Sequence, residues 1–126
     1  MRLYWMPGDF TVCQLSDLSG FDPDGVAPEA VPFFLSCTGS EISLVCRTAL
    51  VPPAAVARED GWSLLRVEGP LEFSLVGILS SLTGTLATAG IPVFAVSTFD
   101  TDYLLVHTDR LSETLTALRT AGHRVE

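Results

Sequence analysis

Two stretches of the chain combine residue types that suit the binding of a small polar molecule. The first is FSLVGI, from Phe73 to Ile78, at the predicted start of a helix. A helix N-terminus offers unpaired amide groups and a partial positive charge, which suit a carboxylate. Gly77 would let a ligand approach the backbone closely. The alternative is an ordinary helix start, with Ser74 as the N-cap and two tolerated glycines.

The second stretch is STFDTDY, from Ser97 to Tyr103, in a predicted hairpin turn. It carries two carboxylates among hydroxyl side chains, and Asp102 could accept hydrogen bonds from a ligand's ammonium group. The alternative is a turn whose Asp and Thr side chains bond their own backbone. Asp100 and Asp102 lie two residues apart in a turn, so nothing holds them across a substrate for paired-carboxylate hydrolysis.

The sequence shows no arrangement of residues that points to catalysis or metal binding. The only histidines are His107 and His123, and no nucleophile motif, phosphate loop or dinucleotide fingerprint accompanies them. Cys13, Cys37 and Cys46 lack Cys-x-x-Cys spacing and are predicted to be free thiols in strands. Cys37 and Cys46 flank a predicted hairpin and are expected to lie near each other. We therefore predict no catalytic residue, no metal and no cofactor.

Composition limits the class of partner. The 126 residues are 48% hydrophobic and carry a net charge of −8, which disfavours binding to nucleic acid or to an acidic membrane surface. The uncharged stretch 73–99 is long enough to cross a bilayer, but its Ser and Thr residues and the Gly90-Ile91-Pro92 break favour a buried helix followed by a buried strand. The start MRLYWMPGDF does not resemble a secretory signal, so we expect a cytoplasmic location.

The second half of the chain shows the clearer secondary-structure pattern. Short β-prone runs are predicted as strands, and leucines at intervals of three and four residues predict two helices. The predicted elements are a strand at Trp62–Val67, a helix from Ser74 to a stop at Gly90, a strand at Ile91–Phe99, a strand at Tyr103–His107, a helix capped by Asp109 and stopped by Gly122, and a short strand at His123–Glu126. This βαββαβ order predicts a ferredoxin-like α+β fold.

The first half contains three strand-like runs, Phe10–Leu15, Phe33–Cys37 and Ile42–Arg47, with little sign of a helix. The order favours a degraded copy of the second half, mostly β, with the strands kept and the helices lost. We therefore predict two packed parts, 1–60 and 61–126.

Long stretches of the second half match a known family in order and spacing. They are GW-x-x-L-x-V-x-GPL-x-F from Gly61 to Phe73, the helix start at Gly77, and AGI-x-VF-x-VSTF-x-TDY-x-LV from Ala89 to Val106. With these motifs the chain resembles ACT-domain proteins, and is similar to the ACT modules of the eukaryotic cytosolic arginine sensor family.

The resemblance implies an ACT domain at 61–126, a degenerate ACT-like part at 1–60, and a regulatory role without enzymatic activity. ACT modules bind amino acids at interfaces between modules, so a homodimer or another homo-oligomer is expected. The alternative is an assembly or accessory module of an enzyme complex, without a ligand of its own. The residues expected at the ligand are Ser74, Leu75, Val76, Gly77, Ile78, Thr98, Phe99, Thr101 and Asp102.

Overall fold

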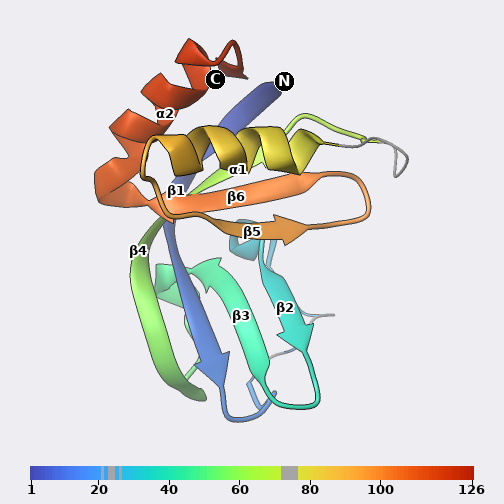
Figure 1. The fold of residues 1–126 in the computed structure, drawn as a ribbon. Helices are drawn as coiled ribbons and strands as arrows, with labels where there is room; N and C mark the ends of the chain where they lie inside the picture. Colours follow the sequence, from blue (N-terminus) through green and yellow to red (C-terminus); the bar gives the residue numbers. More distant parts are fainter. Residues whose placement is uncertain (21, 23–24, 26, 72–76) are drawn as a thin grey trace. The chain divides into compact units, whose positions relative to one another are not determined.

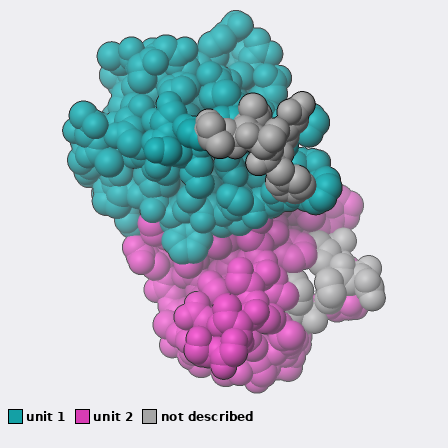
Figure 2. Space-filling view, turned by 45° about the vertical axis from the view of Figure 1, so that its right-hand side comes forward, with its two compact units in different colours: residues 1–7, 63–126 teal, residues 8–62 magenta. Residues whose placement is uncertain are grey.

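The computed structural model describes residues 1–20, 22, 25, 27–71 and 77–126. The chain divides into two compact units, coloured separately in Figure 2: unit 1 comprises residues 1–7 and 63–126, and unit 2 comprises residues 8–62. Two long strands, β1 (Arg2–Leu15) and β4 (Ala55–Val67), each contribute residues to both units.

The sheet of unit 1 has the strand order β5–β6–β4–β1, with β7 paired to β1. The hairpin strands β5 (Phe94–Ser97) and β6 (Asp102–His107) are antiparallel, whereas β7 (Arg124–Val125) runs parallel to the start of β1. The predicted βαββαβ order is observed. Its last strand, however, does not pair with its first, because the start of β1 lies between β4 and β7.

Two helices, α1 (Ile78–Thr88) and α2 (Leu111–Thr120), cover one face of this sheet (Figure 1). Their leucines Leu82, Leu86 and Leu118 are fully buried in the core of unit 1. Burying one such side chain stabilises the fold by about 1.5–3 kcal/mol. Both helices therefore depend on their apolar stripe, as the spacing of the leucines predicts.

The observed ends of the helices agree with the sequence-based prediction better than their observed starts do. Gly90 follows α1 with a φ of 73°, as expected for a helix stop. The predicted N-cap Ser74 lies outside the described residues, and the observed N-cap is Gly77. Asp109 does not cap α2, because it lies inside the 3-10 turn η4 (Thr108–Arg110) that precedes the helix.

Unit 2 is a sheet with the order β2–β3–β1–β4 and no α-helix among its described residues. Its elements are β2 (Phe34–Cys37), β3 (Ile42–Arg47), parts of β1 and β4, and the 3-10 turns η2 (Pro28–Ala30) and η3 (Thr48–Leu50). The three strands predicted for this half are present. The sequence alone missed the start of β1, because Pro7-Gly8 interrupts any regular pattern there.

The expected proximity of Cys37 and Cys46 is wrong. Cys37 pairs with Ile42 across the hairpin and is exposed, whereas Cys13 and Cys46 are both buried in one apolar cluster, and the Cys13 thiol donates to the carbonyl of Leu44 at 3.4 Å. The reason is register: Cys13 on β1 lies opposite Leu44, two residues from Cys46 and on the same face. All three thiols are free.

The two units contain the same hairpin at a constant offset along the chain. β2 and β5 begin at residues 34 and 94, and β3 and β6 begin at 42 and 102, with equal strand lengths. The side-chain oxygens of Thr11 and Thr48 lie 2.9 Å apart in unit 2, and those of Ser63 and Thr108 lie 2.9 Å apart in unit 1. That the first half is a degenerate ACT module with a boundary at residue 60 stays a prediction.

Two further classes of feature bear on function. Within the described ranges, no helix has the length and apolar character needed to cross a membrane. The same residues contain no group of three or more His, Cys, Asp or Glu side chains placed to hold a metal ion.

Candidate functional site

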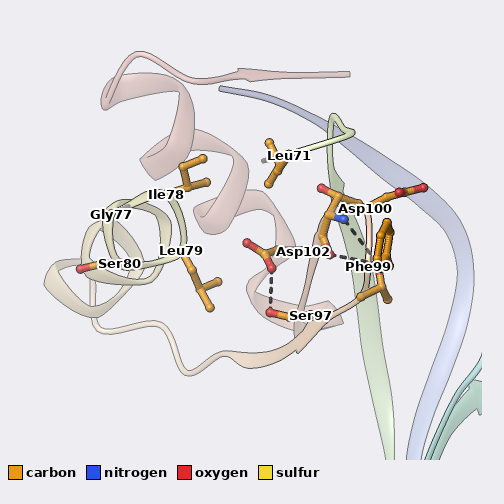
Figure 3. A pocket seen from close by; sticks show the side chains of 11 residues that line it. Leu71, Gly77, Ile78, Leu79, Ser80, Ser97, Phe99, Asp100 and Asp102 are labelled. Atoms are coloured by element: carbon orange, nitrogen blue, oxygen red, sulfur yellow. Dashed lines mark hydrogen bonds between the residues drawn. The ribbon is translucent and has the colours of Figure 1, made fainter. Parts of the chain in front are cut away.

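A cavity of about 340 Å³ opens in unit 1 between the first turn of α1 and the turn that joins β5 to β6 (Figure 3). We call it pocket 1. Its described lining consists of Leu71, Gly77, Ile78, Leu79, Ser80, Ser97, Thr98, Phe99, Asp100, Thr101 and Asp102. Gly77 and Ile78, the described residues of the first stretch that the sequence marks as suited to recognition, thus border the same cavity as the second stretch.

The helix side of pocket 1 is built around Gly77. This residue is the N-cap of α1 and has a φ of 80°, a left-handed conformation that glycine adopts without strain. The amide groups of the first helical turn have no acceptor within the helix. Ile78 and Leu79 are half-buried and supply apolar surface beside them. This side can hold a carboxylate next to an aliphatic group.

The hairpin turn is held by its own hydroxyl groups. The backbone amide and the hydroxyl of Thr98 both donate to the carbonyl of Thr101, at 2.9 and 3.0 Å. The buried Thr101 hydroxyl donates to the carbonyl of Val67 at 2.6 Å, and the Leu71 amide donates to the carbonyl of Asp100 at 2.6 Å. The Thr98 hydroxyl thus bonds the backbone of its own turn, as the alternative for this stretch expects, whereas the Thr101 hydroxyl joins the turn to β4.

Asp102 is the half-buried carboxylate of pocket 1, and Asp100 is the exposed one. The Ser97 hydroxyl donates a 2.7 Å hydrogen bond to Oδ1 of Asp102 (Figure 3). No basic side chain belongs to the described lining of the pocket. The local charge is therefore negative on the hairpin side, which favours a cationic group there.

Phe99 is the most exposed large apolar side chain at the pocket. It lies at the tip of the turn and is 79% exposed. The ring therefore offers apolar surface to a ligand or to another protein surface.

Six of the nine predicted residues line pocket 1: Gly77, Ile78, Thr98, Phe99, Thr101 and Asp102. The other three, Ser74, Leu75 and Val76, lie outside the described residues. That any of the nine contacts a ligand stays a prediction.

Five lining residues are absent from the predicted set: Leu71, Leu79, Ser80, Ser97 and Asp100. Ser97 and Asp100 belong to the STFDTDY stretch, so the predicted site residues beside them in the sequence were enough to predict that both line the pocket. Leu79 reads as part of the core stripe of the helix, and only the three-dimensional arrangement shows that it also borders the cavity. Leu71 reaches the pocket through its bond to Asp100, which no local pattern indicates.

Comparison with known proteins gives a family match and several shared folds. The family model of the ACT domain matches residues 57–120. The crystal structure of a protein from Agobacterium tumefaciens is 34% identical, with a TM-score of 0.82 over 99% of this chain and 91% of that one. A possible transport protein from Vibrio cholerae is 19% identical, with a TM-score of 0.67 over 95% of this chain and 88% of that one.

The ligand-free regulatory subunit of aspartate kinase from Thermus thermophilus is also similar. It is 8% identical, with a TM-score of 0.65 over 95% of this chain and 96% of that one. At these identities the Vibrio and Thermus proteins show a common fold and nothing finer.

Proposed function

Because the chain belongs to the ACT domain family, we propose that it is a regulatory module that binds a free amino acid in pocket 1 and performs no chemistry on it. ACT domains are typically small-ligand regulatory modules. The observation that carries the proposal is the meeting of the α1 start and the acidic hairpin at one cavity. Its volume lies within the usual range for small-molecule sites.

The two sides of the pocket suit the two charged groups of a zwitterion. The α-carboxylate would accept hydrogen bonds from amides of the first turn of α1, next to Gly77. The α-ammonium would donate to Asp102, whose carboxylate already accepts a hydrogen bond from Ser97. Ile78 and Leu79 would contact the aliphatic part of the ligand.

The charge of the pocket predicts which amino acids bind more tightly. Asp100 and Asp102 place two carboxylates in the described lining, with no cation beside them. An acidic side chain would meet two like charges, so aspartate and glutamate should bind weakly. Neutral and basic amino acids should bind better. Arginine belongs among the first to be tested, given the resemblance to the modules of the arginine sensor family.

Phe99 supports a role for self-association. Its side chain is 79% exposed and belongs to the lining of pocket 1. A second copy of the chain seated there would cover the ring and enclose the ligand. We therefore propose a homodimer whose assembly responds to the amino acid.

The test is a thermal-shift screen of the full chain against the twenty amino acids, followed by calorimetric titration of the hits. A ligand present at about one hundred times its Kd should stabilise the chain by about 2.7 kcal/mol and raise Tm by several degrees. Asp102→Asn should abolish the shift, and Asp109→Asn, an exposed acid outside the pocket lining, should leave it intact.

A shift that Asp102→Asn preserves would place the ligand elsewhere on the chain. The absence of a response to any amino acid, together with one constant enzyme partner in a pull-down, would favour the accessory-module alternative.

A further inference from the structure

The cores of the two units occupy equivalent positions of their sheets. Two strands in each unit contribute two buried side chains apiece: β1 and β3 in unit 2, and β4 and β6 in unit 1. In unit 2 these are Cys13, Leu15, Leu44 and Cys46, and the matching residues of unit 1 are Leu65, Val67, Leu104 and Val106. The match is supported by the pair of hydroxyl side chains beside each set, Thr11 with Thr48 in unit 2 and Ser63 with Thr108 in unit 1.

What covers this face differs between the units. In unit 1 the four residues pack in one cluster with Leu82, Leu86 and Leu118 of the two helices, and they are 0% exposed. In unit 2 the described covering consists of irregular chain and the turns η2 and η3. This covering leaves a cavity of about 470 Å³, which we call pocket 2. Leu44 and Cys46 line it, at the positions that the helix leucines cover in unit 1.

We propose that pocket 2 is a second binding site, which takes a small, uncharged apolar molecule. Its described lining includes Phe33, Leu44, Leu50, Val51 and the Pro52-Pro53 pair. Its volume lies in the range of small-molecule sites. The occupant would take the place of the leucine side chains that fill the equivalent space of unit 1.

The chemistry of the lining selects against other occupants. Asp22 is the only charged side chain among the described lining residues, so an anionic amphiphile would find no cation there. An α-helix with its side chains is about 10–12 Å across, so a cavity of this volume holds little more than one helical turn. Described walls on two sides, with Ala30 and Phe33 on one and residues 49–53 on the other, leave room for a compact molecule. Pocket 2 shares no described residue with pocket 1.

The neutral fluorescent probe N-phenyl-1-naphthylamine tests the proposal on the full chain. We expect a saturable fluorescence increase with one probe bound per chain, and much weaker binding of the anionic probe 1-anilinonaphthalene-8-sulfonate. Ala49→Trp places an indole at the exposed rim of the cavity and should weaken binding by about tenfold or more. The matched control, Ala57→Trp on an exposed part of β4, should bind the probe as the unchanged chain does.

Two further measurements separate pocket 2 from pocket 1. Asp102→Asn should leave probe binding unchanged, and Ala49→Trp should leave the amino-acid thermal shift unchanged. Either proposal can then fail while the other stands.

Three outcomes would overturn the second site. They are the absence of saturable binding, equal binding of the neutral and anionic probes, and insensitivity to Ala49→Trp in a variant whose circular dichroism is native. If Ala49→Trp instead abolishes binding of a leucine-rich helical peptide or dissociates a dimer of the chain, pocket 2 belongs to a protein surface and the proposal is likewise wrong.

Discussion

Ser97 and Asp102 lie directly opposite each other in the β5–β6 pair, and the serine hydroxyl donates a 2.7 Å hydrogen bond to the carboxylate. The bond closes the last pair of the hairpin just before the turn. It also fixes the orientation of the half-buried carboxylate of pocket 1. We expect the second oxygen of that carboxylate to accept a hydrogen bond from the ligand's ammonium group.

Ser97→Ala should weaken amino-acid binding without unfolding the chain. The variant loses one hydrogen bond to a charged group, worth about 1.5–3 kcal/mol at most, and Ser97 is exposed. Because Asp102 keeps its charge, we expect Kd to rise by about fivefold to tenfold, less than in Asp102→Asn. Calorimetric titration measures this. Ser36→Ala, on the equivalent strand of unit 2, is the control and should bind normally.

Thr101→Val should destabilise unit 1. The buried Thr101 hydroxyl donates a 2.6 Å hydrogen bond to the Val67 carbonyl, and valine has the same shape without the donor. A buried acceptor left unpaired costs about 1–3 kcal/mol of the free energy of unfolding. Urea denaturation followed by circular dichroism measures the loss. Thr101→Ser keeps the hydroxyl and should lose much less, and equal losses in the two variants would contradict the role of the bond.

Asp60 should give unit 2 a pH-dependent stability. The Thr11 hydroxyl, which donates to its carboxylate at 2.7 Å, and the Arg58 guanidinium beside it lower the pKa of Asp60 below its ordinary value of 3.8. A lowered folded-state pKa means that the contribution is present above about pH 4 and is lost as the pH falls through the folded-state value. The difference in unfolding free energy between the native chain and Asp60→Asn should therefore be larger at pH 6 than near pH 3.

Thr11→Val tests whether the hydrogen bond from Thr11 is what lowers the pKa of Asp60. It removes the donor from the buried threonine and should reproduce part of the loss of pH dependence. An unchanged pH dependence in both variants would show that the carboxylate has no special stabilisation in the folded chain.

The three cysteines should differ sharply in reactivity. Burial raises the pKa of Cys46 to about 12 and also raises the pKa of Cys13, so neither thiol ionises near neutral pH. Because the thiolate is the reactive form, iodoacetamide near pH 8 should label the folded chain once, at the exposed Cys37. Mass spectrometry counts the labels. Cys37→Ser should give no label until denaturant is added, and fast labelling of Cys46 in the folded chain would contradict its burial.

The sequence was most informative where structure is local. The apolar runs and turn residues around Ser97–Tyr103 predicted the β5–β6 hairpin, and leucine spacing predicted both helices, because periodicity reports which face is buried. Both stretches were assigned to one small ligand, and Gly77 and Ile78 line the same pocket as the hairpin; their contact with a ligand stays a prediction.

Long-range pairing was not predictable in the same way. Nothing in residues 2–9 alternates cleanly, and Pro7-Gly8 suggests a break, yet β1 runs through them. Its place between β4 and β7 depends on partners more than fifty residues away in the sequence. The contact of Cys13 with Cys46 depends on strand register, which neither cysteine's neighbours indicate.

The pairing of β1 with β7 has a consequence for folding of the chain. Arg2 and Leu3 pair with Arg124 and Val125, so this part of the sheet joins strands that lie far apart in the sequence. Contacts between such distant residues close a large loop and therefore form slowly. Until β7 pairs, the start of β1 carries an open strand edge, with which another chain can pair.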